Sequence, residues 1–259
     1  MAELLKQLLG KELDSPKGPR LLWTGNDGWL LSDGEYLIAI DPDWVNPERL
    51  TAPPIPPEEA ARRLDLVLLT HAHEDHFSAQ TCEILLREGV CRFVLPESCA
   101  AKAEEIGIPK NRIILVRPGD RFAEAGMEVE CVRAIHGHVG GTVYSGASTL
   151  DCGYRFRFGG RSFYEPGDTL LLEEHQEMAP VDVLFVSPTE HNTWINGSKW
   201  LMERLAPKLT LAQHFGTYEE PEVNRFWAHG YVEELREALA PADRERYRIP
   251  VQGEIIPLG

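Results

Sequence analysis

The chain has no apolar run long enough to cross a membrane and no cluster of basic residues. A membrane-spanning helix needs about 20 consecutive apolar residues, so the sequence argues against an integral helical membrane protein. The formal net charge of −15 would repel the phosphate backbone of a nucleic acid at long range. We therefore expect a small-molecule substrate as the partner, with neither a nucleic acid nor a membrane involved.

Cysteine is also scarce, with five residues and no Cys-x-x-Cys pair. Disulfide frameworks and zinc clusters need paired, regularly spaced cysteines, so buried reduced thiols are expected instead. The first residues, which include Glu3 and Lys6, lack the apolar core of a secretory signal. No Gly-x-Ser-x-Gly motif offers a serine nucleophile. These features predict a cytoplasmic protein whose chemistry does not depend on a nucleophilic side chain.

The chain is of a length and composition that suit a single domain over residues 1–259, with 43% hydrophobic residues. Leucine spacing predicts an amphipathic helix over about 2–13, which could pack on its own domain or on a neighbouring subunit of a homo-oligomer. Strands followed by strand–helix alternation occur twice, over about 20–126 and 127–252. This order predicts an α/β (α+β) fold in which two mixed sheets pack face to face, with helices outside.

The C-terminal part carries two further structural expectations. Its apolar spacing predicts a helix over 222–239, followed by a final strand near Ile249–Val251. His175 lies in a helical stretch with polar neighbours, so we expect it at the surface.

The most informative segment is His-Ala-His-Glu-Asp-His at 71–76, directly after an apolar, strand-like run. Alternate side chains of an extended segment share a face, so His71 and His73 can bind one cation. Asp75 and His76 follow after the chain turns, and they can face a second cation. Imidazole and carboxylate are ligands that Zn²⁺, Mn²⁺ and iron share. The segment therefore predicts a site for divalent metal ions.

Three more candidate ligands come where later strands should end, namely His136, Asp168 and His214. Ligands on different strands can converge only if the strand ends meet at one edge of a sheet. His138 is an alternative to His136, which we prefer because it ends its strand directly. If His138 is not a ligand, it could lie near the substrate.

The order His-x-His-x-Asp-His, followed by His, Asp and His, resembles the metallo-β-lactamase-fold hydrolases. Two further stretches, Leu-Trp-Thr-Gly-Asn-Asp-Gly-Trp-Leu-Leu at 22–31 and Pro-Gly-Asp-Thr at 166–169, resemble the branch that contains the L-ascorbate-6-phosphate lactonases. The segment between Pro188 and Asn196 differs from that branch. The resemblance therefore bears on the metal site more than on the substrate.

This resemblance implies the metallo-β-lactamase fold, a four-layer αβ/βα sandwich, and a dinuclear site for two divalent metal ions. The expected ions are Zn²⁺ or Mn²⁺, and the ligand set suits Fe²⁺ as well. The resemblance further implies that one metal is held by His71, His73 and His136, the other by Asp75, His76 and His214, and that Asp168 bridges the two.

Such a site activates water for hydrolysis, because two cations stabilise a bound hydroxide near neutral pH. We expect this metal-bound hydroxide to attack a small, anionic ester, lactone or phosphoester, with Asp75 orienting it. One alternative is a phosphodiesterase directed at phospholipids or nucleotides. Another is a metal-binding sensor without turnover.

Other residues are expected around the metals. His191 lies in a loop after a strand, where it could act as a catalytic acid or stabilise an oxyanion. Trp194 and Tyr218 lie near the same loops and could bind the substrate. Asp41 and Glu165 each follow or end a strand, and could hydrogen-bond a ligand histidine from behind.

Overall fold

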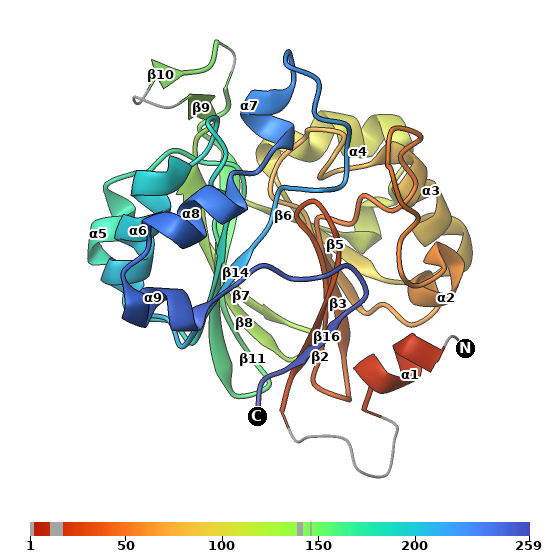
Figure 1. Cartoon of the computed structure of the whole chain (residues 1–259). Helices are drawn as coiled ribbons and strands as arrows, with labels where there is room; N and C mark the ends of the chain where they lie inside the picture. Colours follow the sequence, from red (N-terminus) through yellow and green to blue (C-terminus); the bar gives the residue numbers. More distant parts are fainter. Residues whose placement is uncertain (1–2, 11–17, 139–141, 146) are drawn as a thin grey trace.

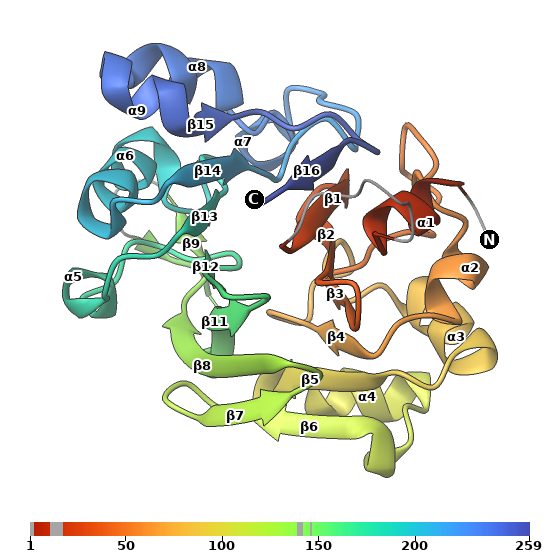
Figure 2. The same cartoon turned by 90° about the horizontal axis from the view of Figure 1, so that it is seen from below.

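The computed structural model describes residues 3–10, 18–138, 142–145 and 147–259. Two seven-stranded sheets face each other, and helices cover their outer faces (Figures 1 and 2). This is the four-layer αβ/βα sandwich that the sequence predicts. Within the described ranges, no helix combines the length and the apolar content needed to cross a bilayer.

The first sheet has the strand order β16-β1-β2-β3-β4-β5-β6, with parallel pairing from β3 to β6. Its strands are β1 (Arg20–Gly25), β2 (Gly28–Ser32), β3 (Leu37–Ile40), β4 (Leu66–Leu68), β5 (Arg92–Pro96), β6 (Ile113–Val116) and β16 (Ile255–Pro257). The helices on its outer side are α1 (Glu3–Leu8), α2 (Pro57–Ala61), α3 (Ala79–Glu88) and α4 (Ala100–Ile106), with the 3₁₀ turns η1 (Glu97–Cys99) and η2 (Lys110–Arg112).

The second sheet has the order β15-β14-β13-β12-β11-β8-β7. Its strands are β7 (Arg121–Glu124), β8 (Met127–Ala134), β11 (Asp151–Phe158), β12 (Arg161–Glu165), β13 (Val183–Val186), β14 (Leu209–Ala212) and β15 (Tyr247–Arg248). The remaining helices are α5 (Glu174–Glu177), α6 (Trp194–Leu205), α7 (Arg225–Ala228), α8 (Val232–Ala238) and α9 (Pro241–Arg246). The short strands β9 (Gly137–His138) and β10 (Thr142–Val143) pair beside α7, at the top of Figure 1.

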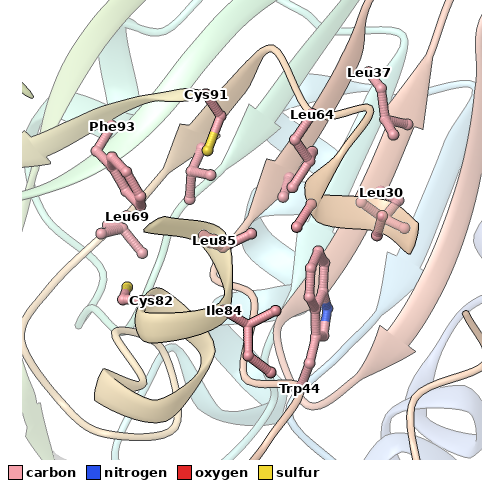
Figure 3. Close-up of a cluster of buried hydrophobic side chains, with 14 of the residues drawn as sticks. Leu30, Leu37, Trp44, Leu64, Leu69, Cys82, Ile84, Leu85, Cys91 and Phe93 are labelled. Carbon is pink, nitrogen blue, oxygen red and sulfur yellow. The ribbon is translucent and has the colours of Figure 1, made fainter. Parts of the chain in front are cut away.

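Three buried hydrophobic cores fill the spaces between these layers. The first lies between the first sheet and its helices, and Figure 3 shows Leu30 and Leu37 of the sheet in the same cluster as Ile84 and Leu85 of α3. Ser78 begins α3 by accepting a hydrogen bond from the backbone N–H of Thr81 at 3.2 Å. The second core lies between the sheets, and the third lies under α6 and α8. Because Leu85 is fully buried, its truncation to alanine should cost about 2–5 kcal/mol.

The structure differs from the sequence-based expectations near the C-terminus. The predicted helix over 222–239 is two helices, α7 and α8, separated at Gly230 and Tyr231. Gly230 has φ 75°, and a Cβ there would lie 2.3 Å from the Cβ of Phe215. A continuous helix is therefore incompatible with the close packing of the loop that contains Phe215. The predicted final strand near Ile249–Val251 was also misplaced. The strands of this region are β15, which ends at Arg248, and β16, which begins at Ile255.

Three other expectations differ from the structure in part: the N-terminal helix, the two halves of the chain and the position of His175. The structure has the N-terminal helix over Glu3–Leu8, and residues 2 and 11–13 of the predicted range lie outside the described residues. The halves predicted at 20–126 and 127–252 differ from the sheets at two strands, since β7 belongs to the second sheet and β16 to the first. His175 is fully buried rather than at the surface, with its Nε2 2.7 Å from the hydroxyl of Tyr164.

The sheet topology brings the carboxyl ends of several strands to one edge. Strands β12, β13 and β14 run parallel, and β8 has the same direction because it is separated from β12 by one antiparallel strand. In the facing sheet, β3 and β4 are also parallel. The loops that follow these strands carry the candidate ligands.

Candidate metal centre

One group of candidate ligands consists of His71, His73, His136 and Asp168. Each offers one ligand atom, and these atoms all lie within 4.8 Å of one another. The Oδ2 atom of Asp168 is 3.1 Å from Nε2 of His136 and 3.9 Å from Nε2 of His71. The structure thus brings together the residues predicted for the first metal. His136, and not His138, occupies the place beside Asp168.

A second group consists of Asp27, His76, Asp168 and His214, whose ligand atoms also lie within 4.8 Å of one another. Nε2 of His76 is 3.6 Å from Oδ2 of Asp168, and Nε2 of His214 is 3.4 Å from the same atom. Asp168 belongs to both groups, which is the position that a bridging carboxylate needs. Asp75 is close as well, with its Oδ2 atom 3.6 Å from Nε2 of His76 and of His214.

Asp27 was missed by the sequence analysis. It lies in the turn between β1 and β2, where Asn-Asp-Gly reads as an ordinary hairpin turn. Its Oδ2 atom is 3.7 Å from Nε2 of His76 and 3.6 Å from Nε2 of His214. Two carboxylates, those of Asp27 and Asp75, therefore approach the same pair of imidazoles. Only the tertiary approach of the turn to that pair reveals this contact, and the one signal in the sequence was that Asp27 lies within the stretch 22–31 that carries the family resemblance.

Several buried polar atoms of the site have no hydrogen-bond partner in the described structure, as expected for metal ligands. Buried atoms without a hydrogen-bond partner in the described structure include Oδ2 of Asp27 and Nε2 of His71, His76, His136 and His214. Such atoms are costly when left unpaired, and their grouping around Asp168 suits a metal ion as the missing partner. The opposite ring nitrogens of two of these histidines are already used. Nδ1 of His71 is 3.0 Å from Oγ1 of Thr70, and Nδ1 of His76 is 2.8 Å from Oδ2 of Asp41.

Asp41 and Glu165 support the site in different ways. Asp41 forms the predicted hydrogen bond to His76 and also accepts one from the backbone N–H of Thr70 at 2.8 Å. The described hydrogen bonds of Glu165 do not reach a histidine. Its Oε1 atom accepts from Nε2 of Gln213 at 2.7 Å, so it acts on the residue that precedes His214.

Two unusual backbone conformations hold ligands in place. Gly167 has φ 61°, and a Cβ there would lie 2.8 Å from the Cβ of Thr70, so only glycine lets the turn before Asp168 pack this closely. His214 has φ 61° although it carries a side chain. Its backbone N–H donates to the carbonyl oxygen of Asn26 at 3.1 Å. Strain of about 1–3 kcal/mol at such residues is typical of functional sites.

Burial and neighbouring charges shift the pKa values of the candidate ligands. Burial, together with the charge of His76, lowers the pKa of His71 well below 6.5, so its imidazole is neutral. Burial opposes ionisation of Asp168, but His214, His76 and His191 outweigh it and hold its pKa well below 3.8. Neutral imidazole and ionised carboxylate are the forms that bind metals. Burial opposes a charge on His76 and His214, but the surrounding carboxylates outweigh it, raising the pKa of His76 well above 6.5 and that of His214 to about 9. These two rings must therefore lose a proton when they bind a metal.

His191 lies beside the centre, as predicted from its place after β13. Its Nε2 atom is 2.9 Å from Oδ2 of Asp168, and Nδ2 of Asn192 donates to Oδ1 of Asp168 at 2.9 Å. The ring of His191 stacks on that of His136, with the ring centres 4.9 Å apart. Burial lowers the pKa of His191 to about 4, so the imidazole is neutral at pH 7.

A cavity of about 430 Å³ opens onto the two ligand groups. Tyr218 lines it, as predicted, and donates a hydrogen bond to the carboxylate of Asp43. Trp194 and His138 are not among the described residues that line it. The ring of Trp194 packs against Tyr231, with ring centres 4.6 Å apart, and Nε2 of His138 is 3.8 Å from a carboxylate oxygen of Glu190. The substrate contacts predicted for these two residues have no support from the cavity lining.

Comparison with known sequences places the chain in a broad family. A family model described as "Beta-lactamase superfamily domain" matches residues 36–215. An uncharacterized protein of Mycobacterium tuberculosis is 25% identical over 255 residues, which covers 88% of this chain and 65% of the relative. A probable L-ascorbate-6-phosphate lactonase of Escherichia coli is 26% identical over 137 residues, covering 48% of this chain and 39% of the relative. The match thus spans less than two thirds of each relative.

Solved structures share the fold over nearly the whole chain. Igni18, a metallo hydrolase from the archaeon Ignicoccus hospitalis, is 23% identical, with a TM-score of 0.69 over 93% of this chain and 98% of its own. An isothiocyanate hydrolase from Delia radicum gut bacteria is 17% identical, with a TM-score of 0.70 over 92% of this chain and 99% of its own.

Proposed function

The chain belongs to the metallo-β-lactamase superfamily, and on that premise we propose that it is a dinuclear metal-dependent hydrolase of small esters, lactones or phosphoesters. One observation carries the proposal. Five buried ligand atoms without hydrogen-bond partners in the described structure surround one shared carboxylate, that of Asp168. This arrangement suits two divalent cations and has no evident structural purpose without them.

The ligands would divide between the two cations. His71, His73 and His136 would hold one, His76 and His214 the other, and Asp168 would bridge them. Asp27 and Asp75 would both serve the second cation. When bound, such a pair of cations supplies a hydroxide near neutral pH and polarises the substrate oxygen.

The chain's own residues orient the reactants. Oδ2 of Asp75 is held by Nδ2 of Asn26 at 3.1 Å and lines the cavity, where it can accept a proton from the attacking water. His191 also lines the cavity. In the structure its Nε2–H donates to Oδ2 of Asp168 at 2.9 Å. Once cations occupy that oxygen, the neutral imidazole would be released to donate to the substrate oxygen that gains charge.

The test is hydrolysis by the purified protein before and after removal of metal. The panel contains a lactone, a phenyl ester, a thioester, bis(4-nitrophenyl) phosphate and, because of the fold it shares with the isothiocyanate hydrolase, phenethyl isothiocyanate. We expect chelation to abolish hydrolysis of an ester or lactone, and Zn²⁺ or Mn²⁺ to restore it. Full activity after chelation would contradict the proposal. A metal-loaded protein that hydrolyses nothing would support the sensor alternative.

The same panel separates the two kinds of hydrolase. Faster turnover of bis(4-nitrophenyl) phosphate than of the esters, after correction for the uncatalysed rates, would favour the phosphodiesterase alternative. The expectation of an anionic substrate came from the family resemblance, and no described residue of the cavity supports it.

A further inference from the structure

The outer lining of the cavity differs in chemistry from the metal centre. Beyond the candidate ligands and His191, the described residues that line it comprise four aromatic residues, two acids and one amide, but no lysine or arginine. These residues are Tyr144, Tyr218, Phe226, Trp227, Glu48, Glu74 and Asn46.

The aromatic rings flank the ligand histidines. The ring of Tyr144 stacks on that of His136, with ring centres 5.2 Å apart. The ring of Trp227 meets that of His214 edge-on at 6.3 Å, and it lies 5.6 Å from the ring of Tyr218. A substrate whose reacting bond lies over the cations must place its attached group among these rings. Trp227 is only half-buried, so a ligand there would remove apolar surface from water.

Two basic side chains close to this lining, those of Arg49 and Lys102, are already engaged. The guanidinium of Arg49 donates to the backbone oxygens of Asp43 and Thr24, at 2.5 and 2.6 Å. The ammonium of Lys102 lies 2.8 Å from a carboxylate oxygen of Glu74. An anionic group in the outer cavity would therefore meet the carboxylates of Glu48 and Glu74, with no lysine or arginine among the described lining residues. Like charges at such a surface disfavour binding.

We infer that the substrate carries a neutral aromatic group, or a similarly flat apolar group, next to the scissile ester or lactone bond. The inference rests on the proposed hydrolase function and names its substrate class. In the reaction, water cleaves the bond between the acyl carbon and the ester oxygen. The hydroxyl group goes to the acyl carbon and the proton to the leaving oxygen.

The first test compares kcat/KM values of the metal-loaded protein on matched esters. Phenyl acetate carries the neutral ring, 4-acetoxybenzenesulfonate adds a negative charge that binds metals weakly, and methyl acetate lacks the ring. Each value is divided by the rate of hydroxide-catalysed hydrolysis of the same ester. We expect phenyl acetate to exceed both of the others by about 10-fold or more. Equal values, or a preference for the sulfonate, would overturn the inference and leave the hydrolase function intact.

A pair of variants connects the preference to the lining. Trp227→Ala should lower the ratio of phenyl acetate to methyl acetate turnover by about 10-fold, and Trp227→Phe should retain most of the ratio. Phe122→Ala is the matched control, because Phe122 lies on β7, outside the residues that line this cavity. An unchanged ratio in Trp227→Ala, with the metal content intact, would contradict the assignment of Trp227 as a contact of the substrate's aromatic group.

A binding measurement keeps the inference testable if no ester is hydrolysed. Calorimetric titration of the metal-loaded protein would compare acetanilide with 4-acetamidobenzenesulfonate, which are amide counterparts of the two aryl esters. We expect acetanilide to bind at least about 10-fold more tightly. Preferential binding of acetanilide without any ester turnover would refute the hydrolase and support the aromatic site. Tighter binding of the sulfonate, or no binding of either compound, would refute the aromatic site.

Discussion

Asp168 is the residue on which the candidate centre converges. Its Oδ2 atom lies between 2.9 and 3.9 Å from the Nε2 atoms of five histidines, namely His71, His76, His136, His191 and His214. Five imidazoles around one carboxylate oxygen leave little room for a purely structural hydrogen-bond network, because each hydrogen bond needs its own donor direction. The metal ions proposed above would account for the arrangement.

The role of Asp27 leads to a prediction about the second metal. Asp27→Asn should weaken binding of one of two metals by about 10-fold or more, because the amide removes a charged ligand atom while Oδ1 can still accept from Oγ of Ser187. Titration with Zn²⁺ or Mn²⁺ measures this. The matched control is Asp33→Asn, since Asp33 caps a turn between β2 and β3. If both variants bind two metals with wild-type affinity, Asp27 is not a ligand.

His136 and His138 form a natural pair for comparison, because they lie two positions apart in the chain. His136→Ala should reduce metal affinity, since its Nε2 atom faces Asp168 at 3.1 Å. His138→Ala should leave the metal stoichiometry unchanged, since His138 belongs to neither described ligand group and its Nε2 atom lies 3.8 Å from a carboxylate oxygen of Glu190. Elemental analysis of both variants decides the assignment. A loss of metal from His138→Ala alone would move the ligand by two residues.

His191 is predicted to act on the substrate rather than to bind a metal. His191→Ala should keep both metals but lower turnover by roughly 10²-fold, the scale of losing a positioned donor. Metal analysis and kcat are measured on the same preparation. A variant that loses a metal would make His191 a ligand, and wild-type turnover would remove it from the mechanism.

The sequence predicted seven ligand candidates because apolar runs mark where strands end. His136, for example, follows the alternating residues of β8, and His214 follows the apolar strand β14. Asp27 could not be found this way. It follows a strand too, but the turn Asn-Asp-Gly has a sufficient local explanation, and its approach to His76 depends on how the first sheet packs on the second.

At the scale of elements, the missed strands are those whose local signal is weakest. β16 has only three residues, and its pairing with β1 joins the two ends of the chain. β7 alternates between exposed and half-buried residues, so no buried face distinguishes it. The break between α7 and α8 depends on the packing of Gly230 against Phe215, which spacing along the helix does not record. Elements with strong local patterns were mostly predicted, whereas the weakly patterned strand β7, which pairs with its neighbour β8, and the contacts between distant segments were not.

The burial of His175, which lies in α5 against Tyr164 of β12, leads to a prediction of how the free energy of unfolding depends on pH. Burial lowers the pKa of His175 from 6.5 to about 4 in the folded protein. As the pH falls through 6.5, the unfolded chain therefore takes up a proton first. The associated stability is fully present above pH 6.5 and is lost between pH 6.5 and 4, by about 3 kcal/mol at most.

Urea unfolding at several pH values measures this dependence. His175→Gln can keep an acceptor near the backbone N–H of Leu172 but cannot titrate, so it should lose less stability than the wild type between pH 6.5 and 4. His229→Gln is the control, because Glu220 and Glu234 outweigh burial and raise the pKa of His229 instead. An equal loss in wild type and His175→Gln would show that His175 does not titrate in this range.

At the scale of the whole molecule, the net charge of −15 and the described cavity lining, which has acidic residues but no lysine or arginine, both disfavour an anionic group on the substrate. Two divalent cations would offset only a small part of this charge, and they would form the positive region that the described cavity lining otherwise lacks. The catalytic centre would then attract the polar reacting bond, and the aromatic rings would accept the apolar remainder of the substrate. A cytoplasmic location, a homo-oligomer and the absence of nucleic-acid and membrane partners stay predictions.

The most direct test of the account is the number of metal ions bound per chain. The protein is stripped with a chelator, titrated with Zn²⁺ or Mn²⁺, and analysed for metal content alongside Asp168→Ala. We predict about two ions per wild-type chain and the loss of at least one ion, with all hydrolysis, in the variant, whose circular dichroism spectrum should stay unchanged. Full occupancy of both sites in Asp168→Ala, or a wild-type chain that binds no metal, would contradict the dinuclear centre.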